Sequence, residues 1–248
     1  MSTVATPPEA SFLERHHFLL RRLHSLTGII PVGVFLMFHL LANSTAYRGS
    51  QQFDLFVKQI HQLPWLVAIE YAFIFIPLAF HGIYGIAIAW EGKLNQNQYP
   101  YMDNWRYTLQ RVTAYVAFAF ILLHLAHIRY AYLFPGGQHF PDENFFEFTQ
   151  RSFQGMWLPL AAWNVIYWFG TLAVVYHFCN GIVTFCITWG ITVGDEARKK
   201  VGYGALVIGL VLMAWTTTSL IGLSRAAQGE TPEPGSVVGY VAPAEAAH

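Results

Sequence analysis

Long apolar stretches alternate with shorter polar ones along this chain, and five of the apolar stretches are long enough to cross a bilayer. A helix needs roughly 20 residues to span the hydrocarbon core. We expect the spans at about residues 22–46, 64–90, 106–133, 157–191 and 202–223. The pattern predicts an all-α fold: an integral membrane bundle of five transmembrane helices in a single domain over residues 1–225.

Both ends of the chain lie outside these stretches. The first apolar run is too long and arrives too late for a cleaved signal peptide, so we expect it to be retained. Residues 226–248 are rich in proline, glycine, glutamate and alanine, which predicts a flexible tail.

The composition agrees with a lipid environment. The chain is 54% hydrophobic and 11% charged, whereas soluble domains average about 25% charged residues. The formal net charge is zero, which gives no support for a nucleic-acid partner. We therefore expect the lipid bilayer to surround the helices.

The basic residues near the segment ends indicate the orientation. With the N-terminus inside, nine of them fall on the inner side and five on the outer side. Because inner loops carry the excess of lysine and arginine, this count favours an N-terminus inside and, after five crossings, a C-terminus outside.

Four histidines lie deep in four different apolar segments: His39, His81, His124 and His177. A histidine at such a depth needs a partner, because hydrocarbon offers none. Two weak repeats pair the segments. In the first and third segments a histidine follows a threonine by 12 or 11 residues, and in the second and fourth the histidine is followed four residues later by a glycine. A glycine there removes a side chain that would block a flat macrocycle.

Depth favours the same pairs. At about 1.5 Å per residue, His39 and His124 lie roughly 26 Å from the inner ends of their segments, His81 about 15 Å and His177 about 20 Å. Two layers of two histidines suit two b-type haems inside the bundle, each with two axial imidazoles. No CxxCH sequence occurs, so any haem would be held without thioether links. Zinc fits less well, since it takes three or four protein ligands at one place.

Other interpretations of these histidines stay open. Any one of them could form hydrogen bonds across helices or line a proton path. His127 could replace His124 as the ligand, although the depth of His124 matches His39 better. The remaining histidines near the termini or in outer loops are expected in solvent: His16, His17, His61, His139 and His248.

A polar cluster opens the first segment. His24 lies about one turn inside it, among Arg21, Arg22 and Ser25, and Arg111 opens the third segment at a similar depth. The cluster could meet lipid headgroups. Alternatively, His24, Arg22, Ser25 and Arg111 could donate hydrogen bonds to a haem propionate or a quinone carbonyl.

At these residues the chain resembles the five-helix, di-haem cytochrome b subunit of succinate:quinone oxidoreductases, that is, succinate dehydrogenase or fumarate reductase (respiratory complex II, an enzyme of the tricarboxylic acid cycle). The short matches follow one another in the right order and cover most of residues 18–195. The matching stretches are 21–28, 38–40, 80–85, 109–113, His124, 176–181 and 188–193.

The resemblance implies that His39 and His124 ligate the distal haem b, and His81 and His177 the proximal haem b. It implies electron transfer between an iron–sulfur partner and membrane quinone, in the cytoplasmic membrane of a prokaryote. It also implies a flavoprotein subunit with FAD and an iron–sulfur subunit, both on the cytoplasmic face. This chain has neither a Rossmann glycine motif nor a cysteine cluster, so FAD, the iron–sulfur clusters and the dicarboxylate chemistry lie on those partners.

One position departs from the resemblance. Some fumarate reductases of this class carry an intramembrane glutamate two residues before the fourth ligand, and here that position is Val175, which speaks against proton transfer by that route. Two other functions remain as alternatives. One is the cytochrome b subunit of a hydrogenase or formate dehydrogenase, and the other is a transporter whose histidines relay protons.

Overall fold

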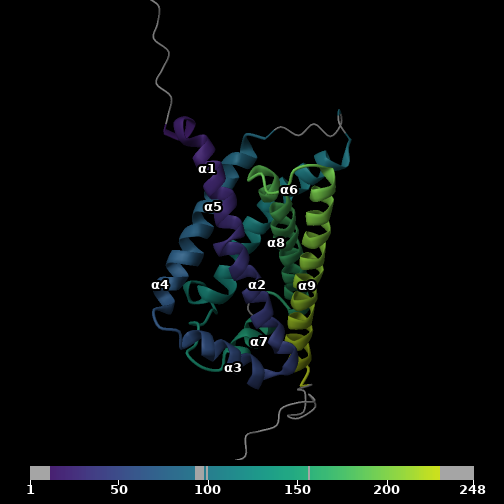
Figure 1. Ribbon diagram of the computed structural model, residues 1–248. Helices are drawn as coiled ribbons and strands as arrows, with labels where there is room; N and C mark the ends of the chain where they lie inside the picture. The colour runs from purple at the N-terminus through teal and green to yellow at the C-terminus, as the bar shows by residue number, and fades with distance from the viewer. Residues whose placement is uncertain (1–11, 93–97, 99, 156, 230–248) are drawn as a thin grey trace, which may run out of the picture. The chain divides into compact units, whose positions relative to one another are not determined.

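The computed structural model describes residues 12–92, 98, 100–155 and 157–229 (Figure 1). The described residues form helices and connecting turns, with no strand among them. Most of the tail predicted to be flexible, from residue 230 onward, lies outside the described residues. The α-helices are α1 (Phe12–Ile29), α2 (Pro31–Ser44), α3 (Ser50–His61), α4 (Leu66–Glu70), α5 (Ile76–Trp90), α6 (Met102–His124), α7 (Phe145–Gly155), α8 (Leu160–Thr188) and α9 (Asp195–Ala227).

Five stretches of the described chain are long and apolar enough to cross a membrane, which confirms the predicted count. Their bounds are Arg15–Arg48, Leu66–Trp90, Met102–Arg129, Leu160–Thr188 and Asp195–Ala227. The last span begins seven residues before the predicted position 202. Its first turn contains Asp195 and Glu196, because acidic side chains suit the positive end of the helix dipole. The fourth span ends before Gly190, whose φ of 70° breaks the helix.

The spans are locally irregular at three places. Pro31 does not end the first span, since hydrogen bonds from Ile30 to Leu26 and from Val34 to Ile30 continue the helix past it. The stretch Tyr71–Phe75 is a π-helical turn just before a proline. A second π-helical turn, Leu125–Arg129, directly follows His124. Such turns often occur at functional sites because they redirect side chains.

Contacts divide the chain into two compact units, so the prediction of one domain over residues 1–225 stays a prediction. The first unit comprises Met1–His39, Pro64–Leu122 and Phe169–Met213. In it, α1 and α5 lie side by side (Figure 1). They run antiparallel, and Arg21 in the middle of α1 forms an ion pair of 3.4 Å with Glu91 just past the end of α5.

The second unit comprises Leu40–Leu63, Leu123–Trp168 and Ala214–His248. It contains two helices, α3 and α7, in regions that the sequence reading treated as outer loops. They pack against each other, and Asp54 of α3 accepts a hydrogen bond of 2.7 Å from the backbone amide of Phe146. That bond satisfies one of the unpaired amides at the start of α7, which helps a short helix to form.

Candidate haem site

A pair of stacked histidines lies between α1 and α5. The rings of His24 and His81 lie 4.1 Å apart between centroids, at 8° between their planes. Each ring lies over a glycine of the other helix: a Cβ at Gly28 would be 2.3 Å from Cε1 of His81, and one at Gly85 would be 2.8 Å from Cε1 of His24. Each histidine precedes the glycine of its own helix by four residues. The two helices therefore pack through reciprocal His-x-x-x-Gly motifs.

His81 and His177 lie together in the first unit. Their ring centroids are 6.0 Å apart, and the planes cross at 79°. Nδ1 of His81 donates to the backbone carbonyl of His24 over 2.8 Å, and Nδ1 of His177 donates to that of Gln110 over 3.1 Å. A carbonyl oxygen can only accept, so in each neutral ring the proton is on Nδ1 and the lone pair on Nε2. Metal-binding histidines are oriented by the same kind of bond.

The separation of these two ring centroids, 6.0 Å, is close to the value for two imidazoles that share one metal ion. A metal ion lies about 2 Å from a bound imidazole nitrogen, which places two ring centroids on opposite sides of one ion about 6 Å apart. Among the described residues, no three or more His, Cys, Asp or Glu side chains form a group that could hold a metal ion. A pair of imidazoles suits a metal whose other ligands come from a macrocycle.

Gly85 and Gly181, the two glycines predicted to leave room for a macrocycle, have different surroundings. A Cβ at Gly181 would make ordinary van der Waals contact with Nε2 of Gln110 and Cδ1 of Ile29, both at 3.8 Å. The space at Gly85, by contrast, is filled by His24. That these two glycines keep room for a macrocycle stays a prediction.

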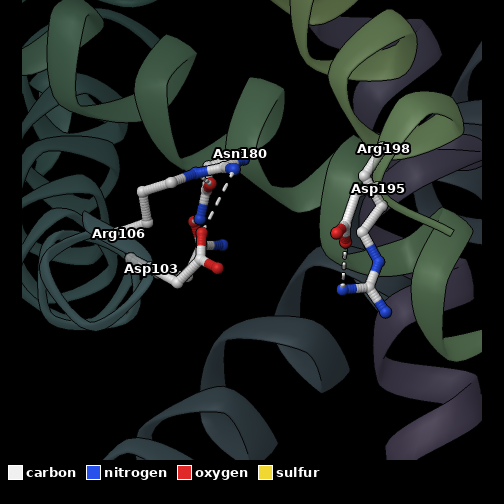
Figure 2. Close-up of polar contacts among 6 residues, drawn as sticks. Asp103, Arg106, Asn180, Asp195 and Arg198 are labelled. Carbon is white, nitrogen blue, oxygen red and sulfur yellow. Dashed lines mark hydrogen bonds and ion pairs between the residues drawn. The ribbon is translucent and has the colours of Figure 1, made fainter. Parts of the chain in front are cut away.

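A hydrogen-bonded chain extends from His177 to the start of α6, and Figure 2 shows the part formed by Asn180, Arg106 and Asp103. Gln110 donates through Nε2 to the backbone carbonyl of His177 over 3.1 Å, and accepts from Nδ2 of Asn180 over 2.8 Å. Asn180 in turn accepts from Nε of Arg106 over 3.0 Å. Arg106 also lies 4.0 Å from Asp103. The sequence reading missed Gln110 and Asn180, because nothing in one sequence shows that their side chains meet.

Of the four polar candidates Arg22, His24, Ser25 and Arg111, two lie near the same tryptophan: Arg22 and Ser25. Trp189 donates to Oγ of Ser25 over 3.1 Å, and the guanidinium of Arg22 lies over the Trp189 ring at 4.9 Å. His24 faces α5 instead, as described above. Arg111 packs against Gly92 and lies 3.7 Å over the ring of Tyr107.

Three of these candidates hold buried nitrogen atoms that have no hydrogen-bond partner within the described chain: Nε of Arg22, Nδ1 of His24 and Nε of Arg111. Leaving a buried donor unpaired costs about 1–3 kcal/mol. Such atoms are therefore suited to a ligand that brings acceptor oxygens, as a propionate or a quinone does.

The predicted distal ligands fall in different units, so their pairing rests on the sequence. His39 lies in the first unit, with its ring 5.2 Å from that of Phe35. His124 lies in the second unit, where its Nδ1 is 3.3 Å from the hydroxyl of Tyr167.

His127, the alternative ligand in the third segment, is fully buried. Both of its nitrogens form hydrogen bonds, Nδ1 with the hydroxyl of Tyr167 at 2.7 Å and Nε2 with the backbone carbonyl of Ser152 at 2.9 Å. This ring has no nitrogen left for iron. The choice of His124 stays a prediction, and these bonds support it.

Four of the other histidines, those at positions 16, 17, 61 and 139, are exposed as expected, and residue 248 lies outside the described part. His61 ends α3 and is not in a loop.

Two comparisons show which known proteins this chain is similar to. The model of the succinate dehydrogenase/fumarate reductase transmembrane subunit family matches residues 93–218. The succinate dehydrogenase cytochrome b558 subunit of Bacillus subtilis (strain 168) is 38% identical over 195 residues, which cover 79% of this chain and 91% of that protein.

Proposed function

The chain belongs to the family of succinate dehydrogenase/fumarate reductase transmembrane subunits, and from this membership we propose how it serves that complex. It is the cytochrome b membrane subunit, and it holds two b haems that connect an iron–sulfur partner with membrane quinone. His81 and His177 are the axial ligands of the proximal haem, and His39 and His124 those of the distal haem. The membership favours this function over a hydrogenase or formate dehydrogenase cytochrome and over a proton-coupled transporter.

The observation that carries the proposal is the arrangement of His81 and His177. Their centroid separation of 6.0 Å suits two axial ligands of one iron. Both rings are held by hydrogen bonds from Nδ1 to carbonyls of neighbouring helices, so both present the unprotonated Nε2. When bound, haem supplies the one-electron oxidation and reduction of its iron. The chain contributes the ligands, their orientation and the apolar surroundings.

Arg22, His24, Ser25 and Arg111 are proposed as donors to a propionate or a quinone carbonyl. Arg22 and Arg111 each offer a buried, unpaired Nε, and His24 an unpaired Nδ1. Charged hydrogen bonds from guanidinium groups to carboxylates are among the strongest in proteins. The hydroxyl of Ser25 accepts from Trp189 and donates its one proton to the backbone carbonyl of Arg22 over 2.9 Å, so it would exchange that carbonyl for an oxygen of the ligand.

We further propose the arrangement in the membrane. The multi-pass chain lies in the cytoplasmic membrane of a prokaryote, with its N-terminus inside and its C-terminus outside, as the count of basic residues favours. The flavoprotein subunit, with FAD, and the iron–sulfur subunit dock on the cytoplasmic face, nearer to the proximal pair.

The test is a reduced-minus-oxidised visible spectrum of the purified protein, with haem counted per chain. Two b haems are expected in the wild type. His81→Ala and His177→Ala should each lose the same haem and retain the other, whereas the exposed control His139→Ala should retain both. A wild type without haem would refute the function. Loss of one and the same component in His39→Ala and His81→Ala would refute the assignment of ligands to layers.

A further inference from the structure

The hydroxyl of Tyr167 lies between two histidines of the second unit. It is 2.7 Å from Nδ1 of His127 and 3.3 Å from Nδ1 of His124. His127 is stacked on Trp163 at 3.7 Å between centroids, so its ring has a fixed orientation. Its other nitrogen, Nε2, is 2.9 Å from the backbone carbonyl of Ser152. These bonds form one line from α7 to the end of α6.

The carbonyl at one end determines the direction of every proton in this line. It can only accept, so Nε2 of His127 donates, and the lone pair of the neutral ring is on Nδ1. Burial in aromatic surroundings favours that neutral ring. Nδ1 therefore accepts the single hydroxyl proton of Tyr167. The tyrosine oxygen can then only accept from His124, which places the proton of His124 on Nδ1 and its lone pair on Nε2.

We propose that Tyr167 and His127 are positioning residues for the distal haem, which hold His124 in the form that binds iron through Nε2. This inference rests on the proposed function, because it requires His124 to be a haem ligand. It gives the buried His127 a role other than ligation. It also connects α7 with the ligand, since Ser152 belongs to that helix.

The proposal predicts a direction for the redox potential. An acceptor at Nδ1 makes the imidazole a more basic ligand, and a more basic ligand stabilises the oxidised iron. Tyr167→Phe removes that acceptor and keeps the ring, so both haems should stay bound and the midpoint potential of the distal haem should rise. We expect about a tenfold change in its ratio of reduced to oxidised iron at a given potential, about 59 mV for one electron.

The experiment is a potentiometric titration of the purified protein, followed in the visible spectrum. The distal component is the one lost in His124→Ala. Tyr115→Phe, at an exposed position of α6, is the control and should leave both potentials unchanged. His127→Leu should shift the distal potential as well, and adding it to Tyr167→Phe should have little further effect, because both changes break one line. His127→Gln keeps a donor and an acceptor and should lie nearer to the wild type.

The outcomes separate this proposal from the proposed function. Wild-type potentials in Tyr167→Phe would overturn the positioning role while leaving the haem function intact. Loss of a haem in His127→Leu, with Tyr167→Phe unchanged, would make His127 the ligand and overturn the proposal. If His124→Ala retained both haems, the ligand assignment itself would fail. A shift confined to the distal haem in Tyr167→Phe supports the proposal.

Discussion

The substitution Gly28→Ala tests the packing of α1 against α5 and the proximal ligand together. The added Cβ would lie 2.3 Å from Cε1 and 2.7 Å from Nδ1 of His81. The ring has little freedom to move aside. Its Nδ1 is bonded to the carbonyl of His24, and the ring of His24 is stacked on it at 4.1 Å. The methyl group therefore either displaces the ring or separates the two helices.

The size of the effect follows from these distances. Ordinary contact begins near 3.4 Å, so the ring must move by roughly 1 Å to accept the new atom. A metal–ligand distance varies by only about 0.2 Å in a proper site. We therefore expect Gly28→Ala to lose the proximal haem. Overpacking of this kind costs about 1–3 kcal/mol of stability, with about 1 kcal/mol more if the hydrogen bond from His81 is lost.

The assay is the haem content per chain of the purified variant, together with its thermal unfolding in detergent. Gly204→Ala is a matched control, because a Cβ there would meet nothing within 4 Å. Alanine in place of glycine favours an exposed helix by about 1 kcal/mol, so the control should keep both haems and full stability. Two haems with wild-type potentials in Gly28→Ala would show that His81 is not held as the structure has it.

Two further predictions concern the contacts between helices. Gln110→Leu removes the side-chain bond to the carbonyl of His177 but keeps the backbone carbonyl of residue 110, which accepts from the His177 ring. The variant should keep both haems, and thermal unfolding should show a loss of stability of about 1–2 kcal/mol. Loss of the proximal haem would contradict this prediction. Gly222→Ala would place a Cβ 2.5 Å from backbone atoms of Ala46 and should destabilise the protein by about 1–3 kcal/mol. Gly204→Ala should not destabilise it. Equal stability of these two variants would refute the close approach of Gly222 to Ala46.

The five spans could be predicted because a membrane imposes a minimum apolar length that one sequence displays directly. The helices α3 and α7 were missed for the opposite reason. They are short and amphipathic, and their apolar faces are matched to each other, as in the contact of 5.7 Å between the rings of Phe53 and Phe146. A pattern within one short segment does not reveal a partner 90 residues away. The π-helical turn Leu125–Arg129 was missed as well, since it arises from local packing.

For the site, the sequence provided the candidate ligands but not what holds them. The motif His-x-x-x-Gly occurs at His81 and His177, and the same spacing from His24 to Gly28 is visible in the sequence. It would have indicated that α1 and α5 pack through these residues. The orientation of each ring depends on carbonyl groups of other helices, such as that of Gln110. Every residue has a backbone carbonyl, so no sequence pattern shows which of these carbonyls accepts the hydrogen bond.

The two proposed haems differ in the groups that accept hydrogen bonds from their histidine ligands. The proposed proximal ligands His81 and His177 donate to backbone carbonyls, which no side-chain substitution removes. On our proposal, the distal ligand His124 donates to a tyrosine oxygen whose direction depends on another side chain, His127. Single substitutions at positions 127 and 167 can therefore change the distal potential, whereas the proximal tautomers change only if the helices move. Variation in potential among substituted proteins should accordingly be larger for the distal haem.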